Sequence, residues 1–286
     1  MVQNTKIKEI QCSSAIGKCG FPGGGFAINP YVGCGHGCAY CYARFIKRFT
    51  GHEEKWGSFV DARINIAEVL EKQMKSSKYK GQQIYIGTVT DPYQSVEEKY
   101  ELMRKILRVL SKSDIQLSIL TKSDLVLRDL DLLKKFKKID VNFTINSLDE
   151  KWVSLVEPNS SKVLRRLEAV KKLTSEGIQV YAMMGPYWPF FTDAESLFKE
   201  FKKAGVNQIF SESFNITGGN FTEVEEILKK NYPDILPKMK EILFDKGKFE
   251  EFYTDAEKKI QKLSKEYSIP ANIYFGIGHA AKFKKK

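Results

Sequence analysis

Short apolar runs rich in β-branched and aromatic residues alternate with longer amphipathic stretches from Gln82 onward. The units recur at about thirty residues, a spacing typical of repeated β/α units. In one amphipathic stretch Leu102, Ile106 and Val109 recur at helical spacing. Gly205 follows another, where helix ends favour glycine. The predicted strands span residues 25–31, 83–88, 115–121, 141–145, 179–184 and 208–211. The predicted helices span residues 64–75, 96–111, 125–137, 162–176 and 192–203.

This alternation predicts an α/β fold with a parallel sheet buried on both faces. In such sheets the reactive groups gather at the carboxyl ends of the strands. After Gly218 the pattern changes to helices rich in Lys and Glu at 222–230, 236–244 and 249–267, followed by an apolar run at 273–277. No linker rich in Pro, Gly or Ser precedes this part. We therefore predict an N-terminal segment at 1–24, a barrel-like unit at 25–218 and a mostly helical C-terminal extension at 219–286.

The composition is that of a folded protein. Of the 286 residues, 42% are hydrophobic and 28% are charged, which excludes disordered and collagen-like chains. Residues 1–9 contain no apolar run that would indicate a targeting signal. No stretch reaches the ~20 apolar residues of a membrane helix. We expect a cytoplasmic protein with no membrane partner.

The net charge of +11 raises the question of a polyanionic partner. Only eight of the 46 basic residues are arginine. Lysine is a hydrated point charge, whereas the arginine fork reads guanine and phosphate, so this excess favours nonspecific attraction over sequence readout. A nucleic acid is therefore a possible partner, and a generally lysine-rich composition is the alternative. We interpret His279 and the lysines at 282 and 284–286 as a solvated tail.

All five cysteines fall within the first 41 residues, which is not the pattern of a core. Cys34, Cys38 and Cys41 form a tight set, with glycines at 33, 35 and 37 that let the backbone wrap closely around a bulky group. In a chain without a secretion signal, such cysteines indicate a metal or redox site before a disulfide. The loop follows the first predicted strand, so it lies at the carboxyl end of that strand.

Two kinds of metal site fit three thiolates. They can hold three corners of a [4Fe–4S] cluster and leave the fourth iron open to a non-protein ligand. Zinc, which favours four ligands in a tetrahedron, is the alternative. His36 lies too near the three cysteines in sequence to complete that tetrahedron easily, so Cys19 or His52 would supply the fourth ligand. We interpret Cys12 and Cys19 as unpaired thiols, with a radical relay at Cys19 as the alternative.

An aromatic residue, Tyr40, stands directly before the last cysteine of the loop. By this signature the chain is identified as a member of the radical S-adenosylmethionine (SAM) superfamily, and over residues 25–218 it resembles the spore photoproduct lyase-like branch. The matching motifs are Asn-Pro-Tyr-Val-Gly-Cys at 29–34, Tyr-Ala-Arg at 42–44, Thr-Val-Thr-Asp-Pro-Tyr at 88–93, Thr-Lys-Ser-Asp at 121–124, Glu-Pro at 157–158 and Arg-Leu-Glu-Ala at 166–169.

The resemblance implies a partial (β/α)6 barrel with an N-terminal cluster-binding loop, in which Cys34, Cys38 and Cys41 hold one [4Fe–4S] cluster. The open iron would take the amino and carboxylate groups of SAM. The reduced cluster would cleave SAM to methionine and a 5′-deoxyadenosyl radical, which would take a hydrogen atom from a substrate in a reaction of lyase or transferase type. An electron donor such as ferredoxin or flavodoxin would be a partner.

In similar enzymes the strand ends carry the contacts to SAM. Lys122 would meet the methionyl carboxylate, and Tyr40 would support the adenine. For Asp91, which stands before Pro92, helix capping is the alternative. The other predicted cofactor-binding residues are Thr88, Thr90, Asp91, Thr144, Asn146 and Met184.

The chain departs from the lyases at one place. They carry a cysteine after the second strand, which returns a hydrogen atom to the repaired thymine, whereas here residues 88–91 read Thr-Val-Thr-Asp. The sequence therefore predicts no repair by that route. Tyr42, Tyr93 and Tyr187 lie in loops at the reactive end and are the candidates for donating hydrogen or stacking a base.

Three hypotheses about function remain, because one fold hosts many chemistries. The first is a radical SAM enzyme acting on a nucleic acid, the second one acting on a small metabolite or peptide, and the third a noncatalytic metal-binding module. A basic rim around the barrel mouth would favour the first hypothesis. A small closed pocket under residues 186–191 would favour the second.

Overall fold

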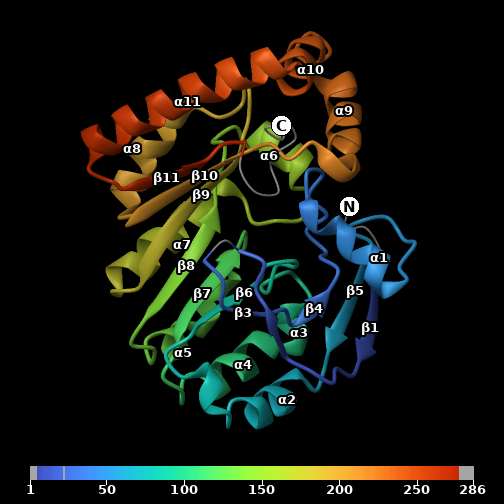
Figure 1. Ribbon diagram of the computed structural model, residues 1–286, viewed down its shortest axis with the longest axis vertical. Helices are drawn as coiled ribbons and strands as arrows, with labels where there is room; N and C mark the ends of the chain where they lie inside the picture. Colours follow the sequence, from blue (N-terminus) through green and yellow to red (C-terminus); the bar gives the residue numbers. More distant parts are fainter. Residues whose placement is uncertain (1–4, 22, 277–286) are drawn as a thin grey trace.

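The computed structural model describes residues 5–21 and 23–276, and its main element is a curved eight-stranded sheet (Figure 1). All neighbouring strands in it are parallel except β2 and β3. Six of these strands, β3 and β6 to β10, are the predicted ones, so the expected α/β fold with a partial barrel is confirmed. In spatial order the strands are β11 (Ala271–Tyr274), β10 (Gln208–Ser213), β9 (Gln179–Tyr187), β8 (Ile139–Thr144), β7 (Gln116–Thr121), β6 (Gln83–Ile86), β3 (Phe26–Ile28) and β2 (Ile16–Lys18).

Helices cover the outer face of this sheet because the longer ones have an apolar stripe. In α4, for example, Leu102, Ile106 and Leu110 are fully buried. The helix α8 begins at Asp193, whose side chain accepts hydrogen bonds from two backbone N–H groups, and ends at Gly205 in the left-handed region (φ 79°). The helices between strands are α2 (Ile66–Gln73), α3 (Glu97–Tyr100), α4 (Leu102–Leu110), α5 (Leu130–Leu133), α6 (Glu150–Val156), α7 (Val163–Ser175) and α8 (Ala194–Ala204).

Two predicted helices differ from the observed ones. The helix expected at 96–111 is divided into α3 and α4 because Glu101 adopts a left-handed conformation with φ 49°. The stretch expected as a helix at 125–137 is mostly the 3-10 turn η3 (Asp124–Asp129), followed by the short α5. The helix α6 was not predicted.

The N-terminal part forms a second, three-stranded sheet that the sequence did not predict. Its order is β1 (Lys6–Ile10), β5 (Phe59–Arg63) and β4 (Tyr31–Val32). The 3-10 turn η1 (Tyr42–Ile46) and α1 (Lys47–Thr50) follow the cysteine loop on the same side of the molecule (Figure 1). The cysteine loop therefore lies between the two sheets. The remaining 3-10 turns are η2 (Ser77–Tyr79) and η4 (Thr217–Gly219).

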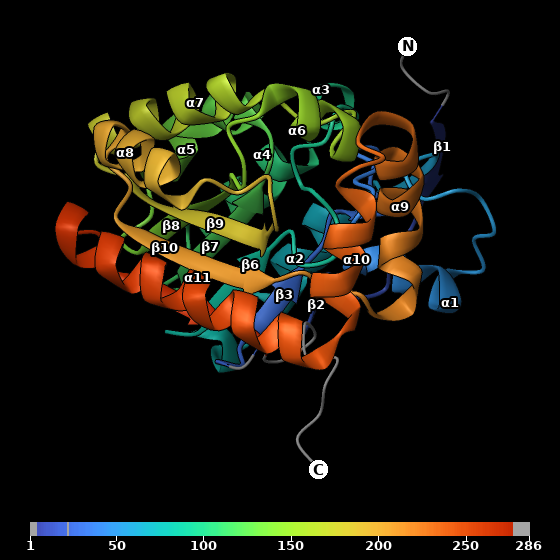
Figure 2. The same ribbon diagram turned by 90° about the horizontal axis from the view of Figure 1, so that it is seen from above.

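The three predicted C-terminal helices are present as α9 (Asn220–Asn231), α10 (Leu236–Phe244) and α11 (Lys246–Tyr267). The helix α11 runs alongside the β10–β11 edge of the sheet (Figure 2). The last strand, β11, then joins that edge, close to the predicted apolar run at 273–277. The Tyr253 hydroxyl on α11 donates to the Tyr187 carbonyl at 3.0 Å, and the apolar core is continuous from the sheet to this extension. The division at residues 24 and 218 stays a prediction.

No helix in the described part of the chain is long and apolar enough to cross a membrane. His279 and the terminal lysines lie outside the described residues.

Candidate functional site

The three clustered cysteines share a cavity of about 170 Å³ at the carboxyl ends of the parallel strands. Cys34 and Cys38 are buried and Cys41 is half-buried, and all three thiols are free. Burial raises the pKa of all three thiols, and for Cys34 the neighbouring Asp91 and Cys41 add to burial and raise it to about 12. Uncharged thiols are therefore the stable form until a metal or a cation compensates the thiolate charge.

The arrangement of the possible metal ligands distinguishes the zinc hypothesis from the [4Fe–4S] hypothesis. Within residues 5–21 and 23–276, no group of three His, Cys, Asp or Glu side chains surrounds the position of one metal ion. A [4Fe–4S] cubane instead binds each thiolate at a different iron, so it needs thiols spread around a larger body. The donor set of three free thiols in one cavity fits a cubane.

Two glycines give the cysteine loop its shape. A Cβ on Gly33, which has φ 81°, would lie 2.5 Å from the Phe59 carbonyl oxygen. Gly37, with φ 60°, packs against Gly57, where an added Cβ would be 3.3 Å from the Gly57 Cα. Only glycine tolerates both the backbone angle and the close approach.

Side chains from three places in the chain bind the backbone of this loop. The Arg44 guanidinium donates to the carbonyls of Ala39 (2.7 Å) and Cys41 (3.0 Å). The Gly35 N–H donates to Gln94 Oε1 at 2.6 Å, and the Gly35 carbonyl accepts from Asn159 Nδ2 at 2.9 Å. None of the three was predicted as a site residue, although Arg44 belongs to the Tyr-Ala-Arg motif. They fix the loop through its backbone and leave the thiols facing the cavity.

Asp91 links the ends of β6 and β7 to the cysteine loop. Its carboxylate accepts from the Thr121 hydroxyl (2.8 Å) and the Lys122 N–H (2.7 Å), and its own N–H donates to Cys34 Sγ at 3.4 Å. His36 Nδ1 lies 3.3 Å from Asp91 Oδ2, although without hydrogen-bond geometry. Burial alone would raise the pKa of Asp91, but His36 and Lys122 outweigh it and lower the pKa to about 2.

Lys122 brings a half-buried cation to the same cavity. Its ammonium group lies 5.7 Å from the centroid of the Tyr40 ring. Burial opposes the charged form, yet Cys38 and Cys41 as thiolates, together with Glu157, raise the pKa of Lys122. The group therefore stays protonated and offers a positive charge next to the thiols.

Tyr40 is held by a buried polar network. Its hydroxyl donates to Glu157, which also pairs with Arg166, and its ring packs edge-on against Trp188 with centroids 5.4 Å apart. Asn146 Nδ2 approaches the Tyr40 hydroxyl at 3.4 Å and the Gly185 carbonyl at 3.3 Å. Asn146 Oδ1 is buried and has no hydrogen-bond partner in the described part of the chain. An acceptor left open in this way points to a bound donor.

The predicted threonines lie at strand ends around the cavity. Thr88, Thr90 and Thr144 all line it. The Thr90 hydroxyl donates to the Gly33 carbonyl at 2.5 Å, so it is engaged by the cysteine loop. The Thr88 carbonyl accepts from the hydroxyl of Tyr42, which also lines the cavity.

Asn146 is not among the residues that line the cavity, although it contacts Tyr40, and three further predicted site residues lie elsewhere. The Tyr93 hydroxyl donates to Asp129 at 3.2 Å inside a fully buried network. Tyr187 faces α11, with its ring 6.1 Å from that of Phe252, and Met184 is completely buried in the core. None of the three lines the cysteine cavity, because successive side chains of a strand point to opposite faces and Tyr93 turns into the core.

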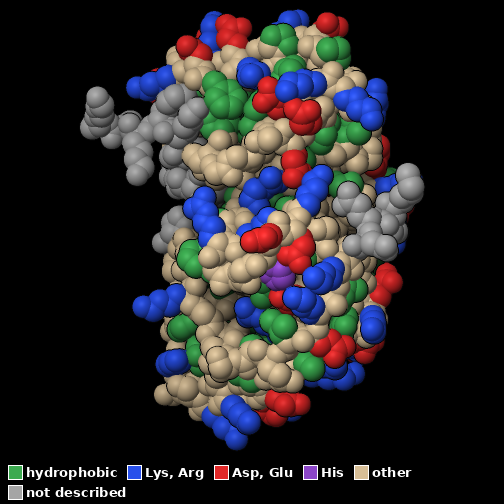
Figure 3. All heavy atoms as spheres, turned by 90° about the vertical axis from the view of Figure 1, so that its right-hand side faces the viewer, with side chains coloured by type: hydrophobic (Ala, Val, Ile, Leu, Met, Phe, Trp, Pro, Cys, Tyr) green, Lys and Arg blue, Asp and Glu red, His purple; other side chains and the backbone are tan. Residues whose placement is uncertain are grey.

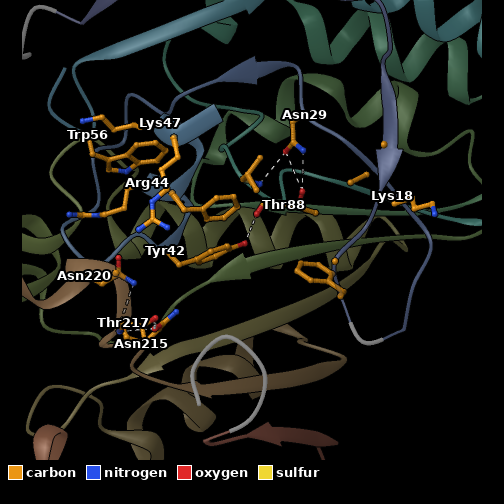
Figure 4. A pocket seen from close by; sticks show the side chains of 18 of the residues that line it. Lys18, Asn29, Tyr42, Arg44, Lys47, Trp56, Thr88, Asn215, Thr217 and Asn220 are labelled. Carbon is orange, nitrogen blue, oxygen red and sulfur yellow. Dashed lines mark hydrogen bonds between the residues drawn. The ribbon is translucent and has the colours of Figure 1, made fainter. Parts of the chain in front are cut away.

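A basic groove of about 1150 Å³ adjoins the cavity and shares Tyr42, Thr88 and Trp56 with it. Figure 4 shows Tyr42 near the middle of the groove, with Lys18 on one side and Lys47 on the other. Lys and Arg side chains gather on the face that carries α1 and β5 (Figure 3). Glu223 is the one acidic residue among the described residues that line the groove. The basic residues that line it are Lys18, Arg44, Lys47, Arg48, Lys55 and Arg63.

Comparison with known proteins agrees with this geometry. Residues 28–195, more than half of the chain, match the model of the radical SAM superfamily. An uncharacterized protein of Methanocaldococcus jannaschii is 36% identical over 261 residues, which cover 91% of this chain and 95% of that protein. An uncharacterized protein of Acidianus two-tailed virus is 32% identical over 219 residues, covering 71% of this chain and 72% of the viral protein.

The fold is similar to that of solved spore photoproduct lyase structures. The lyase complexed with dinucleoside spore photoproduct superposes with a TM-score of 0.68 at 17% identity, covering 94% of this chain and 82% of the lyase. A lyase variant with bound AdoMet and the same dinucleoside gives a TM-score of 0.68 at 18% identity, covering 94% and 81%. The chain belongs to the radical SAM superfamily, whose members use a [4Fe–4S] cluster and SAM.

Proposed function

We propose that Cys34, Cys38 and Cys41 bind the [4Fe–4S] cluster of this radical SAM enzyme and that Lys122 binds the carboxylate of SAM. The observation that carries the proposal is the gathering of three free thiols and one ammonium group around a single cavity. When bound, the cluster and SAM supply a 5′-deoxyadenosyl radical that removes a hydrogen atom from a substrate.

Lys122 has the charge that the carboxylate of SAM requires. Cys38 and Cys41 as thiolates, together with Glu157, raise the pKa of its ammonium group against the effect of burial. A charge-assisted hydrogen bond from such a group is stronger than one made in water. Lys122 therefore orients the methionyl end of SAM beside the thiols.

Tyr40, Thr144 and Asn146 form the part of the site that we assign to the adenosyl group. The open acceptor Asn146 Oδ1 suits the amino group of adenine. Asp91, Thr88 and Thr90 shape the opposite wall through their bonds to the strand ends and the cysteine loop. We do not include Met184, because its side chain is completely buried in the apolar core and, unlike Asn146, leaves no polar atom without a partner.

We further propose that the substrate is a nucleic acid. The groove that leads into the cavity has six basic side chains and one acidic side chain among its described lining residues, and it is several times larger than the cavity itself. Phosphates are the anions that such a row of cations attracts. An enzyme for a small metabolite would instead need a small closed pocket under residues 186–191. Ferredoxin or flavodoxin would supply the electron, in a reducing cytoplasm.

The cluster assignment is tested on anaerobically reconstituted protein by iron content and visible absorbance. Cys34→Ala, Cys38→Ala and Cys41→Ala should each lose the cluster. Cys12→Ala and Cys19→Ala are the matched controls, and they should keep close to one cubane per chain. Full iron content in Cys34→Ala, Cys38→Ala or Cys41→Ala would overturn the assignment. So would a colourless wild-type protein that holds stoichiometric zinc.

The substrate class is tested by the salt dependence of binding. For a nucleic acid, log affinity should fall against log salt with a slope of about −0.7 to −0.9 per phosphate contacted. Binding without that slope, or no binding to DNA or RNA at all, would favour the metabolite or peptide hypothesis. The cluster content of the cysteine variants is measured in a separate experiment. Failure of the cluster assignment can therefore be told apart from failure of the proposed substrate class.

A further inference from the structure

A row of aromatic rings leads from the cysteine cavity to the surface along η1 and α1. Tyr42 lies at the junction of the cavity and the groove, and its ring is nearly parallel to that of Phe45, with centroids 6.5 Å apart and an interplanar angle of 24°. Phe49 continues the row, with its centroid 6.3 Å from that of Phe45. Phe45 is 39% exposed and Phe49 is 77% exposed. Two neighbouring phenylalanines left in water indicate a surface that binds something flat and apolar.

Cations flank this row, and most of them lack an acidic partner. Arg48, Lys55 and Lys18 line the groove without a carboxylate oxygen within 4.0 Å of their charged nitrogens in the described part of the chain. Arg63 also lines the groove, and its Nε is buried without a hydrogen-bond partner among the described residues. Arg44 is different, because it lies 3.7 Å from Glu223. The exposed cations Lys18, Arg48 and Lys55 are free to bind an anionic ligand. The buried guanidinium nitrogen of Arg63 is costly without an acceptor, which a ligand could provide.

We infer that this groove, together with the exposed Phe49 ring next to Phe45, binds an unpaired nucleic-acid strand. Bases stack on Phe45 and Phe49, and phosphates bind Arg48, Lys55 and Arg63. The inference rests on the proposed function and adds the form of the substrate. Aromatic platforms beside a positively charged groove bind single strands because every base has a face that can stack. DNA and RNA share that chemistry, so both are included.

A duplex fits these features less well. In a double helix the base faces are already stacked on one another, so exposed rings on the protein reach them only at an end or at an extruded nucleotide. An acidic electron-transfer protein would meet the same cations, but it has no need of the rings. The combination of rings and cations therefore favours the unpaired strand.

Fluorescence anisotropy tests the inference on the anaerobic holoenzyme at one fixed salt concentration. The probes are labelled strands of about twelve nucleotides, as single-stranded DNA, as single-stranded RNA and as the blunt DNA duplex. The single strands should bind at least about tenfold more tightly than the duplex. Phe45→Ala and Phe49→Ala should each weaken single-strand binding by roughly 5- to 100-fold, which corresponds to the loss of one stacked base.

Leu164→Ala is the matched control, because Leu164 is 63% exposed on α7 outside the groove. It should leave the affinity unchanged. Phe49 is so exposed that its loss should not disturb folding, and a thermal melt of each variant checks this. Equal affinity for single strand and duplex, or unchanged binding in Phe49→Ala and Phe45→Ala, would overturn the inference even if the salt slope shows that a nucleic acid binds.

Loss of all binding to nucleic acids would instead count against the proposed substrate class. A flavodoxin or ferredoxin that binds the wild-type protein and loses affinity in Phe49→Ala would assign the groove to the electron donor and would also overturn the inference.

Discussion

The Gly35 N–H donates a hydrogen bond of 2.6 Å to Gln94 Oε1. This bond fixes the cysteine loop, although the two residues are 59 positions apart in the sequence. The Gln94 side chain is fully buried, and its Nε2 also donates to the Thr90 hydroxyl at 2.9 Å. One amide thus connects the loop to the end of β6. Cys34 directly precedes Gly35 in the sequence and Cys38 follows three positions later, so the bond acts on the part of the loop between these two cysteines.

Replacing Gln94 with methionine should therefore lower both stability and cluster occupancy. The change keeps the volume of the side chain but leaves the Gly35 N–H buried without its acceptor, which costs about 1–3 kcal/mol. Urea unfolding of the apoprotein and iron content after reconstitution measure the two effects. Gln261→Met, at an exposed position of α11, should change neither. Normal occupancy and stability in Gln94→Met would show that the loop is fixed by its other contacts.

Replacing Lys122 with methionine should weaken SAM binding by roughly 10- to 100-fold without loss of iron. The ammonium group lies beside the thiols, and a hydrogen bond to a charged group contributes about 1.5–3 kcal/mol. Calorimetry with SAM under anaerobic conditions gives the affinity, and visible absorbance gives the cluster. Lys151→Met is a suitable control, because Lys151 also lies over a tyrosine ring, 5.1 Å from the Tyr232 centroid, but on the exposed side of α6. Unchanged SAM affinity in Lys122→Met would remove Lys122 from the site.

Two adjacent arginines should differ greatly in their contribution to stability. Arg166 is buried against Glu157, so Arg166→Met leaves a buried carboxylate unpaired and should cost about 3–5 kcal/mol. Arg165 pairs with Asp124 while its side chain is 63% exposed, so Arg165→Met should cost less than about 1 kcal/mol. Urea unfolding at neutral pH compares them. Equal losses would contradict the view that the Glu157 network holds Tyr40.

The effect of Arg166 should also depend on pH. Burial tends to raise the pKa of Glu157, but Arg166 and Lys122 outweigh it and hold that pKa below its ordinary value of 4.5. A carboxylate with a lowered pKa stabilises the fold above its unfolded pKa and loses that contribution as the pH falls below it. The difference between wild type and Arg166→Met should therefore be largest near neutral pH and shrink below about pH 4.5. A constant difference down to pH 3 would exclude this origin.

Six of the eight strands of the large sheet, β3 and β6 to β10, could be predicted because their buried positions carry apolar residues in short runs between helical stretches. The small N-terminal sheet could not, since β1 reads Lys-Ile-Lys-Glu-Ile and all five of its residues are exposed or half-buried. The break at Glu101 also has no local signal, because glutamate seldom adopts φ 49°. At this break the carboxylate of the buried Glu97 on α3 accepts a hydrogen bond from the Met103 N–H on α4, a contact between side chain and backbone that no local pattern indicates.

The sequence could place the cysteines and Lys122 at one cavity, because each belongs to a motif or stands at a strand end, and their roles stay predictions. Gln94 and Asn159 were not, because they act on backbone groups of a loop that is distant in sequence. Tyr93 shows the opposite error. It stands two positions after Asp91 at the reactive end, but its hydroxyl turns inward to Asp129, and a single sequence does not tell which way a loop side chain points.

Val89 occupies the stretch after β6 where the resemblance leads one to expect a thiol, and it lines both the cavity and the groove. A substrate that enters along the groove would pass this side chain, and valine has no hydrogen that it gives up as readily as a thiol does. The wild-type holoenzyme should therefore convert dinucleoside spore photoproduct to thymidine at no useful rate, while still releasing 5′-deoxyadenosine from SAM. Chromatography of both products in one anaerobic reaction measures this. Efficient conversion would mean that another hydrogen donor acts there. Tyr42, whose hydroxyl donates to the Thr88 carbonyl beside Val89, would then be the first residue to replace, with Tyr93→Phe as the control that should have no effect.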